Sequence, residues 1–374
     1  MKIAFRVDAS IEIGTGHVMR CLTLADALRQ QGHTCRFISR AHDGHLGEVI
    51  RQKGFTLHLL PQPETQEPLE EERAQLAHAD WLGASWQADA EQTLGCIADE
   101  HFDWLVVDHY ALDACWEAAV VPSQTRLLVI DDLADRHHLA DVLLDQNLGR
   151  KASDYDRLVP DHCQRLIGPE FALLRPEFAQ WREASLTRRR ENPQLRHLLI
   201  SLGGVDKDNV TGQVLEALAS CELPDETYIT VIVGSTAPWL EEVKAKAKAL
   251  PWPTEFAVSV NDMARRMAEA DLAIGAAGST SWERCCLGLP TLMLVLAENQ
   301  KEVACYLDQL GAAKLVGIPA DLPRNLPVSI SEMTGSVYTR MSEISSEITK
   351  ANGVCSLAFV MKDFESILKM EPER

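Results

Sequence analysis

Short apolar runs alternate with segments of helical periodicity along most of this chain, and this alternation limits the possible folds more than any other feature. The runs predict strands at Lys2–Asp8, Thr34–Ser39, Phe55–Leu60, Asp103–Val107, Arg126–Ile130, Asp141–Leu144, His197–Leu202, Thr227–Val233, Asp271–Gly275 and Pro290–Leu296. Periodic segments predict helices at His17–Gln31, Trp181–Pro193 (with a connector), Asn209–Cys221, Pro238–Leu250 and Thr280–Leu287. Strands that alternate with helices indicate parallel sheets covered by helices, an α/β fold.

The alternation restarts after the arginine-rich stretch, so the 374 residues predict two domains. We expect an N-terminal domain over 1–180, a C-terminal domain over 181–345, and a final helix over 346–374 that could pack back on the first domain. Both domains are expected to be Rossmann-like and to face each other across a cleft, because open α/β sheets bind ligands at the carboxyl ends of their strands. The Pro- and Glu-rich segment Pro61–Arg73 is interpreted as a surface loop.

Charge and composition exclude several classes of partner. The net charge is −19 and the isoelectric point about 5.1, whereas proteins that bind nucleic acid or anionic membranes present a basic surface. No run of eighteen apolar residues occurs, so membrane insertion is not expected. The ten cysteines form no CxxC pair, and those in apolar helical patterns are interpreted as reduced core thiols. These are Cys21, Cys96, Cys285 and Cys305. Because no signal peptide is recognisable either, we predict a cytoplasmic protein.

The loop after the first predicted strand contains Gly14, Gly16 and His17 at a helix start. Glycines let the backbone approach a ligand, and a helix N-terminus favours negative charge. A dinucleotide fingerprint is not supported, because Met19 stands where the third glycine would be. An imidazole with an ordinary pKa of about 6.5 can accept a proton from water at neutral pH, so His17 is a candidate general base. The alternative is a helix-capping or core histidine.

Two glycine-containing loops in the second predicted domain suit a diphosphate. Each follows a strand and precedes a helix, and their candidate binding residues are Gly203, Gly204, Gly278, Ser279 and Thr280. Either loop alone could be an ordinary turn. Two such loops at strand ends of one sheet favour phosphate binding by backbone N–H groups.

Polar residues follow these loops along the chain. Glu283 lies one turn into the second helix, where its two carboxylate oxygens suit the paired hydroxyls of a ribose; the alternative is a solvated glutamate. Asn299 and Gln300 begin a further helix, and their amides could bind the hydroxyl or acetamido groups of a sugar. Helix capping by Asn299 is the alternative.

The second half of the chain resembles the nucleotide domain of MurG-like GT-B glycosyltransferases. The residues that carry this resemblance are Phe256–Met263, Ala270–Gly275, Gly278–Thr280, Glu283, Gly288–Pro290 and Asn299–Gln300. The first half more closely resembles the PseG family of UDP-sugar hydrolases. Its matching residues are Phe5–Asp8, Gly14–Arg20, Val107–Tyr110, Ile130–Arg136, Gly168–Pro169 and Leu173–Phe178. The resemblance covers roughly residues 1–315, and residues 317–374 carry no recognised motif.

The resemblance implies a GT-B fold and hydrolysis of UDP-2,4-diacetamido-2,4,6-trideoxy-β-L-altropyranose, with inversion, in pseudaminic acid biosynthesis. It implies that His17 is the general base and that Asn299 contacts the sugar. It also implies that Val260 offers its backbone to uracil and that Glu283 holds the ribose. UDP is a good leaving group, so a second carboxylic acid to protonate it, as in glycosidases, is not required. No cofactor is expected.

Smaller features complete the candidate site. Tyr110 follows a strand end and is expected to face the sugar, and Arg20 could touch phosphate or extend into solvent. Asp131-Asp132 and His137-His138 lack the spacing of metal ligands, so no metal is expected. We interpret the aspartates as loop-ordering or substrate-contacting groups and the histidines as solvated.

Two other functions fit the same residues. A MurG-like glycosyltransferase would pass the sugar to an acceptor other than water, although this acidic chain shows no basic face for a lipid carrier. A non-catalytic UDP-sugar-binding regulator would need the nucleotide site but not His17.

Overall fold

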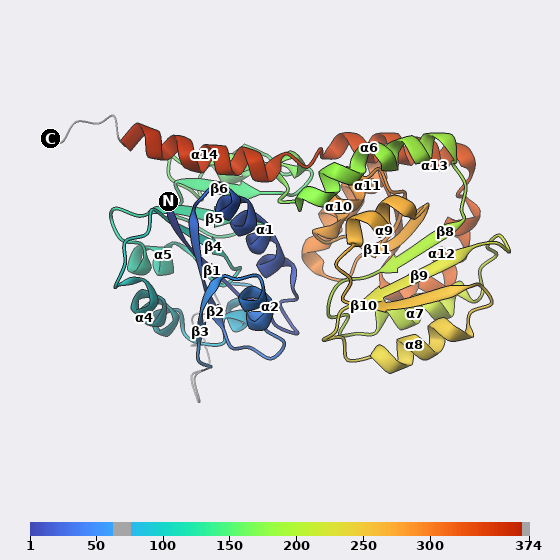
Figure 1. Ribbon diagram of the computed structural model, residues 1–374, viewed down its shortest axis with the longest axis horizontal. Coiled ribbons are helices and arrows are strands. Elements are labelled where there is room, and N and C mark those ends of the chain that lie inside the picture. The colour runs from blue at the N-terminus through green and yellow to red at the C-terminus, as the bar shows by residue number, and fades with distance from the viewer. Residues whose placement is uncertain (63–75, 369–374) are drawn as a thin grey trace. The chain divides into compact units, whose positions relative to one another are not determined.

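The computed structural model describes residues 1–62 and 76–368, and it shows two compact units. One consists of Met1–Leu173 with Asn352–Arg374, and the other of Leu174–Ala351 (Figure 1). The boundary between the two units follows Leu173, seven residues before the expected boundary at 180. The reason is that helix α6 (Pro176–Glu191) packs on three helices of the second unit, α9 (Met263–Glu269), α10 (Thr280–Cys286) and α13 (Gly335–Ile348). Most of the predicted loop Pro61–Arg73 lies outside the described residues.

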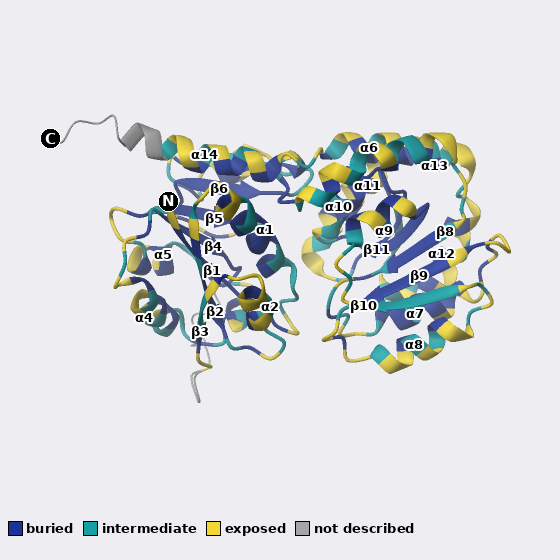
Figure 2. Cartoon of the chain, viewed as in Figure 1, coloured by how far each residue is buried: buried dark blue, intermediate teal, exposed yellow. Residues whose placement is uncertain are grey.

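A seven-stranded parallel sheet forms the first unit, in the order β3-β2-β1-β4-β5-β6-β7. The strands are β1 (Lys2–Val7), β2 (Thr34–Arg40), β3 (Thr56–Leu60), β4 (Trp104–Asp108), β5 (Arg126–Ile130), β6 (Val142–Asp145) and β7 (Gln164–Ile167). The central strands are buried on both faces, which is why they appear in the sequence as continuous apolar runs (Figure 2). Val7 is paired with Asp108, so the ends of β1 and β4 lie side by side at the carboxyl edge.

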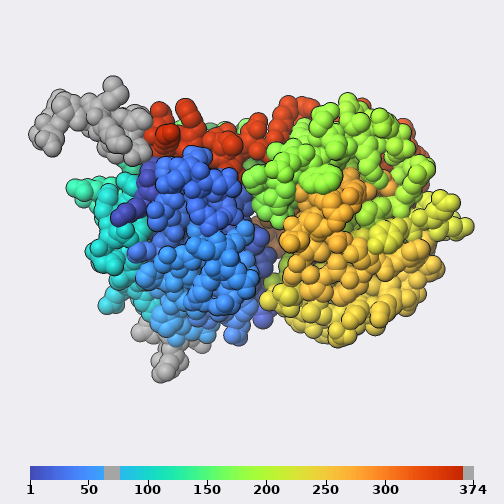
Figure 3. All heavy atoms as spheres, viewed as in Figure 1, coloured from blue at the N-terminus to red at the C-terminus, as the bar shows by residue number. Residues whose placement is uncertain are grey.

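Helices cover both faces of this sheet. They are α1 (Gly16–Gln30), α2 (Gly47–Gln52), η1 (Ala79–Leu82), α4 (Trp86–Ile97), α5 (Ala114–Val120), η2 (Ala152–Tyr155), η3 (Pro169–Phe171) and α14 (Gly353–Leu368). The expected face of α1, with Val18, Leu22, Ala25 and Leu28, is buried in one core cluster. Residues of α14 enter the same cluster, and Figure 3 shows this helix in red against the N-terminal residues in blue.

The second unit has a six-stranded parallel sheet in the order β10-β9-β8-β11-β12-β13. The strands are β8 (His197–Ser201), β9 (Tyr228–Val233), β10 (Thr254–Val258), β11 (Leu272–Ala276), β12 (Thr291–Leu294) and β13 (Lys314–Gly317). The helices, besides α6, are α7 (Val210–Leu218), α8 (Leu240–Ala249), α9 (Met263–Glu269), α10 (Thr280–Cys286), η4 (Glu298–Gln300), α11 (Lys301–Leu310), η5 (Pro319–Asp321), α12 (Leu322–Ser331) and α13 (Gly335–Ile348). Leu198, Ile200, Val231, Ile274 and Leu292 lie at the centre of its core.

The described cysteines are all free, and their burial corrects one expectation. Cys21 and Cys285 are buried as predicted, and Cys96 is partly buried. Cys305 is exposed, because it lies on the outer face of the amphipathic helix α11. No described helix is long and apolar enough to cross a membrane.

Candidate active site

A tight loop after β1 brings His17 to the start of α1. The hydroxyl of Ser10 accepts the N–H groups of Glu12 and Ile13, and the Gly14 N–H donates to the Ser10 carbonyl at 2.9 Å. Gly14 has a φ of 79°, a conformation that favours glycine. Helix α1 then begins at Gly16 without a side-chain cap. The His17 side chain is therefore fixed by the first turn of a buried helix at the carboxyl edge of the sheet.

His17 is paired with Asp108, the last residue of β4. Its Nδ1 atom lies 2.6 Å from Asp108 Oδ1, and the carboxylate is fully buried. Arg20, one helical turn after His17, donates to both Asp108 oxygens, at 2.6 and 2.7 Å. Burial alone would raise the pKa of Asp108, but Arg20 and His17 outweigh it and hold this pKa far below its usual range. An ionised Asp108 accepts the Nδ1 proton, which leaves the Nε2 lone pair of His17 available.

Asp132 and Tyr110 close a ring of contacts that returns to His17. The third nitrogen of Arg20 lies 2.7 Å from Asp132 Oδ2, and the Tyr110 hydroxyl donates to the same oxygen at 2.7 Å. The ring of Tyr110 meets the His17 ring edge to face at 4.6 Å. Arg20 therefore does not extend into solvent, because two carboxylates hold its guanidinium within the fold. The Tyr110 hydroxyl is likewise already bonded, and the residue is 5% exposed.

Two further aromatic side chains cover Tyr110. Trp81, in η1, is stacked on the Tyr110 ring with centroids 5.6 Å apart, and His78 lies 4.4 Å from Trp81. Both residues are partly exposed. Trp81 and His78 thus form a partly apolar surface beside the hydrogen-bonded residues around His17.

The aspartate and histidine pairs after β5 have separate roles. Asp131 is buried, accepts the Ala134 N–H at 2.8 Å and pairs with Arg136, so it orders the loop as expected. His137 is exposed, but the prediction that His138 is solvated is wrong. His138 is buried because its Nδ1 lies 2.6 Å from Glu117. Within residues 1–62 and 76–368, no group of three or more His, Cys, Asp or Glu side chains could hold a metal ion.

In the second unit, the candidate residues follow four of the six strands, at the carboxyl edge of one sheet. Val260 comes after β10, Gly203 and Gly204 after β8, Gly278 after β11 and Asn299 after β12. Neighbouring strands lie about 4.8 Å apart. The edge from β10 to β12 therefore spans on the order of 20 Å, a length that suits an extended nucleotide sugar.

The two expected phosphate loops differ in the donors that they leave available. At α7, the Asp206 carboxylate accepts the N–H groups of Val210 and Thr211, and Asn209 caps Gly212. That helix start is already satisfied by the chain's own side chains. At α10, Ser279 is the N-cap and makes no side-chain cap. The loop Gly278–Thr280 is thus the better candidate for a diphosphate, and Gly203 and Gly204 could contribute only their own backbone.

Glu283 lies in α10 and is paired with Arg175. The Arg175 Nη2 atom donates to Glu283 Oε1 at 3.2 Å, whereas Oε2 has no hydrogen-bond partner among the described residues. Burial raises the pKa of Glu283, and the guanidinium of Arg175 lowers it, with a net value above the usual one. Of the two oxygens that suit a ribose, Oε1 therefore already accepts one hydrogen bond, and Oε2 accepts none from the described residues.

The remaining candidates have polar groups that are open to a ligand. Asn299 is exposed, and α11 has no side-chain cap, so the alternative role of Asn299 as a helix cap is excluded. Gln300 Oε1 accepts the Leu296 N–H at 3.0 Å, which orients its amide beside Gly278. Val260 follows Ser259, which has a φ of 49° and turns the chain after β10. The Val260 N–H and C=O have no partner within the described parts of the chain.

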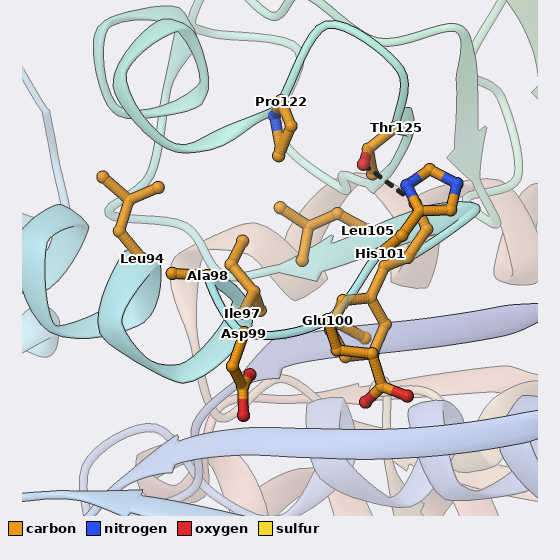
Figure 4. A pocket seen from close by; sticks show the side chains of 11 residues that line it. Leu94, Ile97, Ala98, Asp99, Glu100, His101, Leu105, Pro122 and Thr125 are labelled. Atoms are coloured by element: carbon orange, nitrogen blue, oxygen red, sulfur yellow. Dashed lines mark hydrogen bonds between the residues drawn. The ribbon is translucent and has the colours of Figure 1, made fainter.

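A hollow of about 340 Å³ lies elsewhere in the first unit, where α4 ends (Figure 4). Leu94, Ile97, Leu105 and Pro122 give it an apolar lining, and Asp99 lies at its rim. The Thr125 hydroxyl, which donates to the Phe102 carbonyl at 2.8 Å, is satisfied internally. This hollow lies toward the strand starts and includes none of the candidate residues, so we do not assign it to catalysis.

Asp108, Trp81 and Arg175 had no predicted role, and Asp132 was expected only to order its loop or to contact the substrate. A signal existed for Asp108, since a carboxylate that ends an apolar strand lies at the ligand-binding edge of an α/β sheet. Arg175 was visible only as part of the Leu173–Phe178 motif. Trp81 is separated from the predicted elements and had no local signal.

Comparison with known proteins agrees with this architecture. Residues 198–351, which lie within the second unit, match the glycosyltransferase family 28 C-terminal domain. MurG of Acinetobacter baumannii aligns over 97% of this chain and 99% of its own, with a TM-score of 0.66 and 16% identity. This likeness, with the two parallel sheets, confirms the predicted GT-B fold.

Two sequence relatives are more specific. The chain is 27% identical over 313 residues to the UDP-2,4-diacetamido-2,4,6-trideoxy-beta-L-altropyranose hydrolase of Campylobacter jejuni, covering 83% of this chain and 97% of the relative. It is 30% identical over 178 residues to the spore coat polysaccharide biosynthesis protein SpsG of Bacillus subtilis. That second match covers 47% of this chain and 50% of the relative.

Proposed function

We propose that this protein hydrolyses a UDP-sugar to UDP and the free sugar, with His17 as the general base. The observation that carries the proposal is the pair between His17 Nδ1 and the buried carboxylate of Asp108. This pair leaves Nε2 as the proton acceptor, and no described residue donates a hydrogen bond to it. An imidazole held in this way is suited to remove a proton from water.

The reaction requires few groups. A water oxygen attacks the anomeric carbon and the bond from that carbon to the diphosphate oxygen breaks, while the water proton passes to His17 Nε2. UDP leaves with the electron pair, and the configuration at the anomeric carbon inverts. Backbone N–H groups of the Gly278–Thr280 loop would stabilise the negative charge that develops on the diphosphate. Gly14 and Gly16 allow the substrate to approach the start of α1.

Nucleotide binding is assigned to the second unit. Val260 would contact uracil through its backbone, Glu283 the ribose through Oε2, and Asn299 the sugar, with Gln300 beside it. Val260 follows β10, Gly278–Thr280 and Glu283 follow β11, and Asn299 follows β12, so a base at one end of this sheet edge and a sugar at the other would be consistent with these assignments. Gly203 and Gly204 would make secondary contacts to the diphosphate through their backbone.

For the substrate, we propose UDP-2,4-diacetamido-2,4,6-trideoxy-β-L-altropyranose, in the biosynthesis of pseudaminic acid. The match to the Campylobacter jejuni hydrolase supports this choice, because it extends over nearly the whole relative. The partly apolar surface of Trp81 and Tyr110 would suit a deoxysugar with few hydroxyl groups.

A glycosyltransferase is the second candidate, favoured by the family 28 domain and by the structural likeness to MurG. The test is to incubate the protein with the UDP-sugar in the absence of any acceptor and to measure UDP. Steady release of UDP at many turnovers supports hydrolysis. Release only after addition of an acceptor identifies a transferase, and binding without release identifies a regulator.

A further inference from the structure

Glu283 has an unusual position for a carboxylate that binds a ribose. Its side chain is 16% exposed, and its partner among the described residues is Arg175. Burial favours the neutral form of a carboxyl group unless a cation lies nearby. The charge on Glu283, and so its strength as a hydrogen-bond acceptor, therefore depends on Arg175.

The guanidinium of Arg175 is itself held in place. Arg175 precedes Pro176, which keeps the residue before it extended, with φ −61° and ψ 145°. Its guanidinium lies 5.1 Å from the ring centroid of Phe178, and Nη1 lies 3.2 Å from Glu177. These contacts, all from the first turn of α6, direct Nη2 toward Glu283.

Other charged or titratable groups around Glu283 do not replace Arg175. Arg284 is the next residue, but its guanidinium donates to the Ala276 carbonyl and to the hydroxyls of Thr280 and Ser281. Glu177 is negative and raises the pKa of Glu283. The Cys286 thiol, also nearby, is neutral because burial raises its pKa. Arg175 is thus the cation bonded directly to the carboxylate.

We propose that Arg175 is a positioning residue for nucleotide binding, which keeps Glu283 ionised and leaves its Oε2 turned free for the ribose. This inference rests on the proposed function, because it assumes that Glu283 binds the nucleotide. An ionised acceptor makes a stronger hydrogen bond to a hydroxyl than a neutral one. Loss of Arg175 would allow Glu283 to take up a proton at a higher pH, and the affinity for UDP would fall from that pH downward.

The experiment is calorimetric titration of the full chain with UDP between about pH 5 and pH 8. The variants are Arg175→Gln, Arg175→Lys, Glu283→Gln and the double variant. The phosphate of UDP itself titrates near pH 6. The affinity of each variant at each pH is therefore divided by that of Glu283→Gln, in which UDP still titrates but residue 283 has no carboxylate. Glu177→Gln is the matched control, since it alters the other carboxylate beside Arg175.

We expect Arg175→Gln to weaken UDP about tenfold near the acidic end and less near the alkaline end. Arg175→Lys should restore most of this affinity, and Glu177→Gln should shift the profile in the opposite direction or leave it unchanged. Adding Arg175→Gln to Glu283→Gln should change little. The proposal is overturned if Arg175→Gln keeps the wild-type profile, or if it weakens UDP equally in both backgrounds. If the wild-type protein does not bind UDP, the nucleotide site of the proposed function fails instead.

Discussion

The Nδ1 atom of His17 lies 2.6 Å from Oδ1 of Asp108, although 91 positions separate the two residues in the sequence. The adjacent pairing of β1 with β4 brings them together, because Val7 is in register with Asp108. Arg20 donates to both oxygens of the same carboxylate. The imidazole is therefore held in position before any substrate binds, and the buried carboxylate favours the tautomer with its proton on Nδ1.

Replacement of this carboxylate tests the pair. In Asp108→Asn, the amide group can donate where Asp108 only accepts, so His17 is no longer held with its proton on Nδ1. We expect kcat to fall by about 10²–10⁴-fold with little change in affinity for UDP. The control is Asp103→Asn before the start of β4, where Asp103 accepts the Lys2 N–H at 2.6 Å. Equal losses in the two variants would indicate a general effect on the fold.

Removal of the imidazole gives a second prediction. His17→Ala should lose most turnover, by ~10²–10⁴-fold, since the base is gone. Affinity for UDP should persist, because the nucleotide contacts are assigned to other residues. His101→Ala is a suitable control, since the His101 side chain is 59% exposed and lies near Asp103, which is not among the residues that contact His17. Near-normal hydrolysis by His17→Ala would remove His17 from the mechanism.

Removal of metal ions gives a third prediction. A neutral base and a diphosphate bound by backbone N–H groups need no Lewis acid, so hydrolysis should survive exhaustive treatment with EDTA. UDP release is measured before and after addition of Mg²⁺ or Mn²⁺. A strict requirement for either ion would show that Asp131, Asp132 or another carboxylate had been misassigned.

Buried carboxylates near the site make stability depend on pH. The Tyr155 hydroxyl lies 2.9 Å from Oδ2 of both Asp131 and Asp145, but it has one proton to donate. Asp131 is held ionised by Arg136. Burial, together with the charge of Asp132, raises the pKa of Asp145 to about 7. The Asp145 carboxylate also accepts the Arg150 Nε–H at 3.1 Å and the Asn147 N–H at 2.8 Å. A proton on Asp145 weakens these bonds but removes the repulsion between Asp145 and Asp132.

The fourth prediction follows from this raised pKa. Between about pH 4 and pH 7, Asp145 is protonated in the folded chain but ionised in the unfolded chain, so the folded state binds more protons. The stability contributed by this group is complete below about pH 4 and is lost as the pH rises through 7. Urea unfolding should show that the free energy of unfolding of the wild type falls by up to roughly 4 kcal/mol relative to that of Asp145→Asn over this range. If the free energies of unfolding of the two proteins change in parallel with pH, the raised pKa of Asp145 is contradicted.

Much of the fold could be predicted because central parallel strands are buried on both faces. The runs that became β1, β4, β5, β8 and β11 are apolar apart from their ends and the buried Arg6 of β1. The strands that were not predicted are β7, β10 and β13, and each lies at the edge of its sheet. These three strands are partly exposed and carry polar residues such as Gln164, Thr254 and Lys314, so their apolar runs are short.

The candidate site could be predicted only in part, for a related reason. Glycine loops and His17 stand at strand-to-helix junctions, which are visible in the sequence. The partners of these residues are set by tertiary pairing, as with Asp108 for His17 and Arg175 for Glu283, which is 108 positions away. No local pattern encodes such a distance. The same applies to His138, whose burial depends on Glu117, a residue in α5.

The last prediction separates binding of the nucleotide from binding of the sugar. Glu283→Ala should weaken UDP and the UDP-sugar alike, by about 1.5–3 kcal/mol, because a charge-assisted hydrogen bond to the ribose is lost. Asn299→Ala should leave UDP affinity unchanged and impair only the reaction of the UDP-sugar, since its exposed amide is assigned to the sugar. Glu298→Ala is the control, because Glu298 is 84% exposed beside Asn299 and pairs with Lys301. Calorimetry with UDP, and kinetics with the UDP-sugar, measure both effects. If Asn299→Ala weakens UDP as much as Glu283→Ala does, then Asn299 contacts the nucleotide and the sugar lies elsewhere.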